Sequence, residues 1–148
     1  MSDPMTAGAS FRDLVFRECL SAFPEVTFTV TGQCMRPDLA EGDRVVVLGP
    51  DRKRPRLGDV VLTRRGDAIR LHRLVWKPPR AGSRAPWRTK ADRATSLDPA
   101  LTEADVIGTV AAVEGRPYER RPARALLSLL GAIVARATHR GERAAASP

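Results

Sequence analysis

Three Gly-Asp pairs divide the middle of the chain, and each pair directly precedes a short apolar run. The pairs are residues 42–43, 58–59 and 66–67, and the runs occupy residues 45–48, 60–62 and 69–76. Glycine permits tight turns, and short runs rich in β-branched residues between turns are typical of strands. The pattern therefore predicts short strands joined by turns, which implies a mainly β domain over residues 25–118.

Further strands are expected on both sides of this region. Residues 26–31 alternate between apolar side chains and threonine, which indicates a half-buried strand. Residues 87–90 are expected to form a short strand and residues 106–113 the last one, where Gly108 marks a bulge or a close backbone approach.

A helix is expected before the β domain. Residues 10–24 repeat apolar side chains at helical spacing, between Ser10, which can cap a helix, and Pro24, which ends it. We expect this helix to be amphipathic and residues 1–9 before it to be disordered.

The C-terminal segment, residues 119–140, is expected to form a basic amphipathic helix ahead of a disordered tail at residues 141–148. Residues 125–135 carry no charge, and arginines lie on both sides of them. These eleven residues would form only ~16 Å of helix, about half the thickness of the hydrocarbon core, so they cannot span a membrane. Two environments remain open: the interface of an anionic membrane, contacted through residues 122–140, or a packed position against the domain or a partner helix.

Composition limits the classes of partner. The chain has 148 residues, enough for one domain, and a formal net charge of +8. Its arginines are scattered and not interleaved with aromatic residues, so no nucleic-acid partner is expected. Two cysteines, Cys19 and Cys34, and two histidines give neither a metal site nor a disulfide framework, and no cofactor is expected. The chain shows no cleavable signal sequence or spanning stretch, which favours a cytoplasmic location with, at most, peripheral membrane contact.

A glycine turn presents Cys34 between the first two expected strands, and Pro37 restricts the chain as it leaves the turn. Residues 32–43 read Gly-Gln-Cys-Met-Arg-Pro-Asp-Leu-Ala-Glu-Gly-Asp. This segment resembles the nucleophile box of signal peptidases and LexA-like peptidases, Gly-x-Ser-Met-x-Pro-x-Leu-x-x-Gly-Asp, with Cys34 in place of the nucleophilic serine. The resemblance implies a peptidase with the β-ribbon fold of that family.

Later segments resemble further boxes of the same family, in the same order. His72, followed by an arginine and a leucine, lies where the family has its general base, and histidine there is typical of the archaeal and endoplasmic-reticulum types. Residues 89–92, Thr-Lys-Ala-Asp, resemble the Thr-Lys-Gly-Asp box of those types, with Ala91 in place of the glycine. A second aspartate six residues later orients the histidine in that family, and Asp98 has this spacing. Residues 106–110 resemble the closing strand.

The resemblance implies a role for each candidate residue. Cys34 would be the nucleophile and His72 the base and acid, oriented by Asp98 as first choice and Asp92 as second. Amide cleavage needs these functions together. The backbone N–H groups of Cys34 and Met35 could bind the oxyanion, and a neighbouring imidazolium could lower the pKa of the thiol.

The expected substrate is an extended peptide, such as a leader or signal-like sequence, that lies along the strand before Cys34. The residues expected to line this groove are Val30, Thr31, Gly32 and Gln33.

Two alternatives remain open to different degrees. Sulfur is larger than oxygen, and a positional error of about 1 Å can cost ~10²-fold in rate, so a catalytically retired peptide-binding module with the same fold is a second hypothesis. A LexA-like self-cleaving regulator is disfavoured, because roughly 24 residues before the β domain cannot hold a DNA-binding helix-turn-helix.

Overall fold

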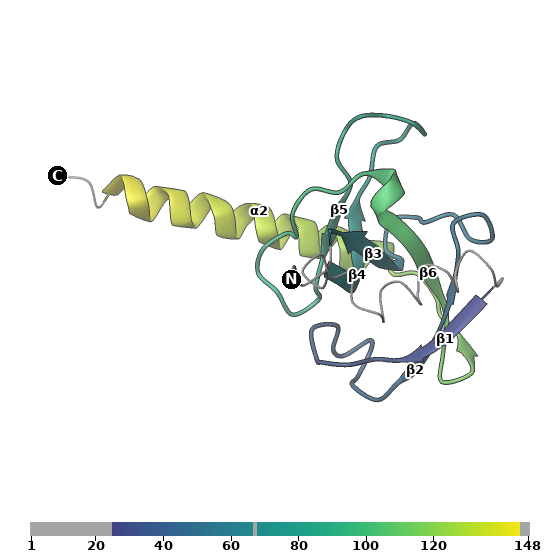
Figure 1. Ribbon diagram of the computed structural model, residues 1–148. Coiled ribbons are helices and arrows are strands. Elements are labelled where there is room, and N and C mark those ends of the chain that lie inside the picture. Colours follow the sequence, from purple (N-terminus) through teal and green to yellow (C-terminus); the bar gives the residue numbers. More distant parts are fainter. Residues whose placement is uncertain (1–24, 67, 146–148) are drawn as a thin grey trace, which may run out of the picture.

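The computed structural model describes residues 25–66 and 68–145, which form one curved β-sheet and a long C-terminal helix (Figure 1). The elements are β1 (Glu25–Thr29), β2 (Arg44–Leu48), β3 (Val60–Arg65), β4 (Ala68–Trp76), β5 (Arg88–Lys90), the 3₁₀ turn η1 (Glu103–Asp105), β6 (Val106–Val113), β7 (Arg116–Pro117) and α2 (Pro122–Ala145). The predicted mainly β architecture is confirmed, and each predicted apolar run lies within a strand. The segments expected to be disordered at residues 1–9 and helical at residues 10–24 lie outside the described residues.

The strands are ordered β1-β2-β6-β3-β4-β5, and β7 pairs with the end of β6. All pairings are antiparallel. The predicted irregularity at Gly108 is confirmed: Leu62 pairs with Gly108 and Thr63 with Val106, so β6 contributes one extra residue between them. The sequence pattern missed β7, because two residues carry no periodicity. Among the described strands, β1 pairs only with β2, so its other edge has no strand partner.

The first two Gly-Asp pairs build the same turn. Gly42 and Gly58 have φ values of 92° and 91°, a conformation that favours glycine. The side chains that follow close the turns: Asp43 Oδ2 accepts from the backbone N–H of Ala40 at 2.8 Å, and Asp59 Oδ2 accepts from that of Arg56 at 2.8 Å. Each pair therefore supplies both the backbone conformation and the hydrogen bond that begin a strand.

β3 is buried on both faces of the sheet, and each face has its own core. One core consists of Val30, Met35, Leu39, Val45, Val47, Val60, Leu62 and Val110, and the other of Val61, Leu74, Trp87, Leu101 and Val106. In the β3–β4 register, Val61 is opposite His72 and Val60 is opposite Arg73. Because successive strand residues point to opposite faces, His72 and Arg73 lie on different sides of β4.

The C-terminal helix differs in its limits from the prediction. It begins at Pro122, a residue favoured at the first helical position, and not at residue 119. It continues to Ala145, so residues 141–145, expected to belong to a disordered tail, are helical. Glutamate, arginine and alanine dominate this stretch, and these are strong helix formers.

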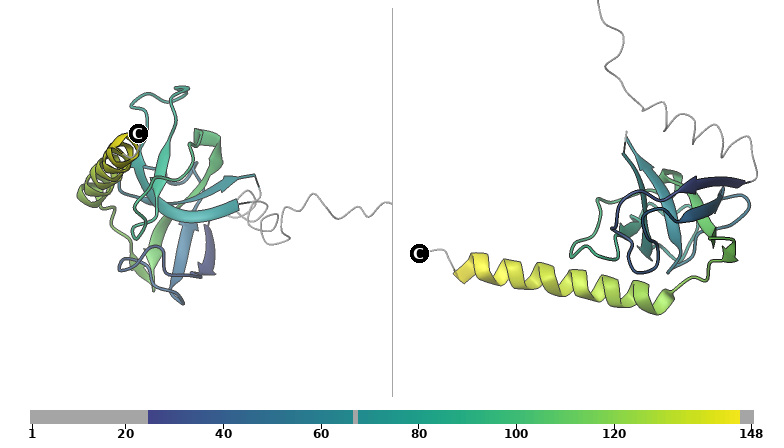
Figure 2. Two further views of the ribbon diagram at one scale, coloured as in Figure 1. Left: turned by 90° about the vertical axis from the view of Figure 1, so that its left-hand side faces the viewer. Right: turned by 90° about the horizontal axis from the view of Figure 1, so that it is seen from below.

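α2 packs on β4 through its small side chains, so that Ala125 and Ala132 are buried. Leu129 is half-buried, whereas five other large apolar side chains of the helix are exposed: Leu126, Leu127, Leu130, Ile133 and Val134. Figure 2 shows that the helix runs along one side of the sheet and then projects beyond it. No helix in the described part of the chain combines the length and apolarity needed to cross a bilayer.

Candidate active site

β4 and the segment after β5 bring His72 and Asp98 together. Nδ1 of His72 lies 2.6 Å from Oδ2 of Asp98, and Thr89 Oγ1 donates to the same oxygen at 2.7 Å. The backbone N–H of Asp98 donates to the Thr89 carbonyl at 2.9 Å, which fixes the position of the carboxylate. The side chains of His72 and Asp98 are 12% and 15% exposed, so the pair is shielded but reachable.

The hydrogen bonds keep Asp98 ionised. Burial acts to raise the pKa of Asp98, but the hydrogen bonds from His72 and Thr89 outweigh burial and hold the pKa below its ordinary value. A carboxylate on Nδ1 favours the tautomer that carries its proton there. Nε2 of His72 is then the nitrogen that can accept a proton from a nucleophile.

Asp92, the second candidate for orienting the histidine, has a different partner. Its two carboxylate oxygens accept from Arg73, Oδ1 from Nε at 2.8 Å and Oδ2 from Nη2 at 2.7 Å. Asp92, the second choice to orient His72, therefore pairs with Arg73 and not with the histidine. The reason is the alternation of β4: Arg73 points to the other face of the sheet, and Asp92 lies on that face.

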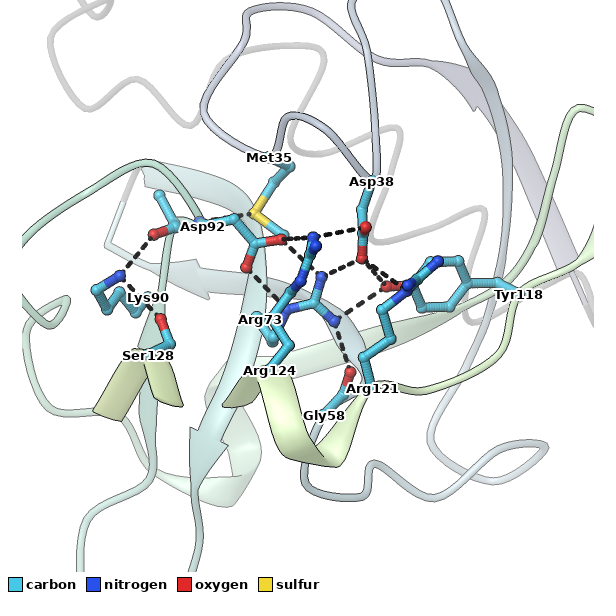
Figure 3. Close-up of polar contacts among 11 residues, drawn as sticks. Met35, Asp38, Gly58, Arg73, Lys90, Asp92, Tyr118, Arg121, Arg124 and Ser128 are labelled. Carbon is cyan, nitrogen blue, oxygen red and sulfur yellow. Dashed lines mark hydrogen bonds and ion pairs between the residues drawn. The ribbon is translucent and has the colours of Figure 1, made fainter. Parts of the chain in front are cut away.

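Arg73 is the centre of a buried network (Figure 3). Its side chain is 0% exposed, and its remaining donors reach Asp38 Oδ2 at 2.6 Å, the Gly58 carbonyl at 2.8 Å and the Tyr118 hydroxyl at 3.0 Å. Burial acts to lower the pKa of Arg73, but the hydrogen bonds with Asp92 outweigh it and raise the pKa. The guanidinium is thus a permanent charge inside the fold, compensated by two carboxylates.

Asp38 links this network to the C-terminal helix. Its Oδ1 accepts from Arg124 Nη1 at 2.6 Å, and its Oδ2 lies 3.1 Å from Arg121 Nε. The hydroxyl of Tyr118 also donates to Asp38, at 3.2 Å. Asp38 belongs to the segment that resembles a nucleophile box, so the network ties that segment to β4, to residues 89–92 and to the start of α2.

The turn that carries Cys34 lies against the residues that follow β5. The Cys34 carbonyl accepts from the backbone N–H of Arg93 at 3.0 Å, and the buried Met35 accepts from the Asp92 N–H through Sδ at 3.5 Å. Cys34 itself is exposed. No hydrogen bond joins Cys34 Sγ to His72 in the described residues, so their pairing as nucleophile and base stays a prediction.

The surroundings of Cys34 keep its thiol protonated. Although the residue as a whole is exposed, partial desolvation of the thiol is the largest cause that raises its pKa. A backbone hydrogen bond opposes this rise, and the negative charges of Asp98 and then Asp92 raise the pKa further. These causes oppose the expected lowering of the pKa by an imidazolium.

The N–H groups predicted to bind an oxyanion are not used elsewhere in the described structure. Neither Cys34 nor Met35 donates its backbone N–H to another described residue.

The groove predicted for a peptide substrate needs one correction. Val30 is 7% exposed, and its N–H and carbonyl pair with Asp43 and Gly42 at 2.8 and 2.9 Å, so it belongs to the core and the sheet.

The other three residues of the predicted groove, Thr31, Gly32 and Gln33, are exposed. They lie between the end of β1 and Cys34.

A cleft of about 480 Å³ lies between the Cys34 turn and α2. It is lined by residues that include Arg36, Pro37 and Leu127. Lys90 also lines it and donates to Ser128 Oγ of α2 at 2.8 Å. Burial lowers the pKa of Lys90, although the negative charges of Asp92 and Asp98 act to raise it.

Across residues 25–66 and 68–145, no group of three or more His, Cys, Asp or Glu side chains is arranged to hold a metal ion.

The structural roles of Arg73, Asp38 and Tyr118 were not predicted from the sequence. The available signal was an arginine directly before Leu74 and Val75 in a predicted strand, because a buried guanidinium requires carboxylate partners. The sequence could not indicate which carboxylates these would be.

Comparison with known proteins adds no family assignment: no protein-family model matches the chain, and no curated protein matches it.

Proposed function

We propose that the chain is a signal-peptidase-like endopeptidase that uses Cys34 as nucleophile, His72 as base and Asp98 to orient the histidine. The observation that carries the proposal is the 2.6 Å contact between His72 Nδ1 and Asp98 Oδ2, further held by Thr89. An imidazole with an ionised carboxylate on one nitrogen and a reachable second nitrogen is the arrangement that a general base requires. Two further observations support this hypothesis: the spacing of the three sequence segments that resemble the family, and the position of the Cys34 turn against the residues that follow β5.

The protonated thiol determines how such a reaction would begin. His72 Nε2 takes the thiol proton as Cys34 Sγ attacks the scissile carbonyl carbon, which forms a C–S bond and an oxyanion. The N–H groups of Cys34 and Met35 stabilise that oxyanion. His72 then returns its proton to the departing amine nitrogen as the C–N bond breaks, and water hydrolyses the thioester and restores the thiol. Asp98 stabilises the transient imidazolium throughout.

An extended peptide is the proposed substrate. The exposed residues Thr31, Gly32 and Gln33 lie between the end of β1 and Cys34. A peptide that lay extended along these residues would be held by backbone hydrogen bonds, as in strand-addition complexes. A leader or signal-like sequence, extended before cleavage, fits this mode of binding.

Peptide cleavage by the purified full chain tests the proposal. Mass spectrometry of the products of a mixed set of leader-like peptides should reveal one preferred bond with the wild type. Cys34→Ala and His72→Ala should abolish cleavage, and Asp98→Asn should lower kcat strongly, because the carboxylate fixes the tautomer. Cys19→Ser is the matched control and should cleave normally. Equal cleavage by wild type and Cys34→Ala would exclude Cys34 as the nucleophile.

A peptide-binding module without catalysis is the second candidate. The raised pKa of Cys34 and the absence of a Cys34–His72 hydrogen bond among the described residues favour it. The module predicts that fluorescent peptides bind equally well to wild type and Cys34→Ala, and that neither protein cleaves them.

A further inference from the structure

The large apolar side chains of α2 form a continuous outward surface. Five residues contribute, with exposures of 57% for Leu126, 69% for Leu127, 49% for Leu130, 54% for Ile133 and 61% for Val134. At about 100° per residue these five side chains cover roughly 120° of the helix, directly opposite the buried Ala125 and Ala132. We call this surface, defined by the five residues, the outer face of α2. It faces away from the sheet.

We infer that the outer face of α2 lies in the interface of a bilayer that contains anionic phospholipids. Solvent-exposed apolar surface of this extent on a folded domain marks a contact site. A helix with an apolar face, flanking arginines and too many charges to span is typical of segments that lie flat in the headgroup region. The inference is independent of the proposed peptidase activity.

The positive charge of α2 favours an anionic partner. From Pro122 to Arg140 the helix contains no acidic residue. Arg124 pairs with Asp38, but neither Arg136 nor Arg140 forms an ion pair with a described carboxylate. Positive side chains beside an apolar face are complementary to anionic lipid, and each basic residue near such a surface contributes attraction.

A cleft on the domain side of α2, which meets the outer face at Ile133, has the chemistry for phosphate groups. It has a volume of about 680 Å³ and lies between α2 and the segment after β5. Arg88, Arg136 and Arg140 line it together with the hydroxyl residues Thr95 and Ser96, and no acidic residue lines it. Ile133 belongs both to this cleft and to the outer face, so a lipid whose chains meet that face could place its phosphate in the cleft.

The shape of the molecule suits a flat surface. α2 has 24 residues, which correspond to ~36 Å, and its C-terminal part projects past the sheet in Figure 1 and in the right-hand view of Figure 2. The sheet therefore does not stand between the outer face and a planar partner. A second copy of the chain fits this face less well. Two α2 helices packed together would bring their positively charged arginines close to one another, and like charges repel.

Vesicle co-sedimentation with the full chain tests the inference. The probes are vesicles of phosphatidylcholine alone and vesicles of an equimolar mixture of phosphatidylcholine and phosphatidylglycerol, each at low and high salt. We expect binding to the mixed vesicles that weakens with salt, and little binding to phosphatidylcholine alone. Leu130→Asp combined with Ile133→Asp should abolish binding, and both sites are exposed, so folding should be unaffected. Ala81→Asp with Ala85→Asp, in the exposed β4–β5 loop, adds the same charge away from α2 and should lower binding much less.

The arginines of the cleft give a second measurement. Arg136→Gln and Arg140→Gln should each lower partitioning into mixed vesicles by about fivefold, from the ~1 kcal/mol expected per basic residue. Failure of the wild type to bind mixed vesicles would overturn the inference. So would binding that the paired Asp variant on α2 leaves unchanged, or a dimer in solution that the same variant dissociates.

Discussion

Gly58 and Pro122 approach so closely that a Cβ on Gly58 would lie 2.5 Å from the nitrogen of Pro122. The Gly58 carbonyl also accepts from Arg73 Nη1 at 2.8 Å and from the Arg121 N–H at 3.1 Å. One residue of a strand-opening turn therefore joins the buried arginine to the first turn of α2. The glycine has two separate functions here: it adopts a positive φ, and it leaves space for the helix backbone.

Alanine substitutions at Gly58 and Gly42 should separate these two functions, because both glycines have a positive φ but only Gly58 lies against the helix backbone. Gly42→Ala, at φ 92° with no atom near the added Cβ, should cost about 1–2 kcal/mol of unfolding free energy from backbone strain alone. Gly58→Ala, at φ 91°, should cost a further ~1–3 kcal/mol because the new methyl group meets the backbone of α2. Urea unfolding of both variants measures the difference. Equal losses would mean that α2 is not held against Gly58 in solution.

Removal of the buried guanidinium should destabilise the domain strongly. Arg73→Leu leaves the carboxylates of Asp38 and Asp92 buried without their central partner, for an expected loss of about 3–5 kcal/mol. Arg65→Leu, at an exposed position of the neighbouring strand, should change stability by less than ~0.5 kcal/mol. Chemical denaturation compares the two variants. If both lose the same small amount, the network of Figure 3 does not hold the fold together.

The lowered pKa of Asp98 predicts a contribution to stability that depends on pH. Because the folded pKa is below the unfolded value, the contribution is present above the unfolded pKa of about 3.9 and is lost as the pH falls through the folded pKa. Asp98→Asn should therefore be less stable than wild type at neutral pH, and the gap should narrow as the solution becomes strongly acidic. Unfolding free energies at a series of pH values provide the measurement. Asp51→Asn, at an exposed position, removes the same charge elsewhere and serves as the matched control.

Labelling of Cys34 should report its raised pKa. In a Cys19→Ser background, the rate of iodoacetamide alkylation should rise only above the ordinary thiol range, because burial and the charges of Asp98 and Asp92 disfavour the thiolate. Asp98→Asn removes one of those charges and should shift the rate profile to lower pH, whereas Asp51→Asn should not. A rate that is already maximal at neutral pH would indicate a standing thiolate–imidazolium pair, as first expected from the sequence.

Much of the architecture could be predicted because it is local. A Gly-Asp pair contains both the residue that permits a positive φ and the side chain that closes the turn, so the starts of β2 and β3 follow from two adjacent residues. The extra residue beside Gly108 and the existence of a C-terminal helix are likewise carried by short stretches of sequence. The contact of His72 with Asp98 could be anticipated only through the spacing of a resembling family, because no local rule joins residues 26 positions apart.

The sequence by itself determined the order of turns and strands, the apolar period of α2 and the set of residues with suitable chemistry. Only the tertiary structure decided that Asp92 belongs to Arg73, that Val30 is buried and that the large side chains of α2 face outward. It also decided that the pKa of Cys34 is raised, because desolvation and carboxylates that are distant in the sequence act on the thiol. The physical reason is the same in each case: local geometry depends on neighbours in the chain, whereas burial and charge depend on neighbours in space.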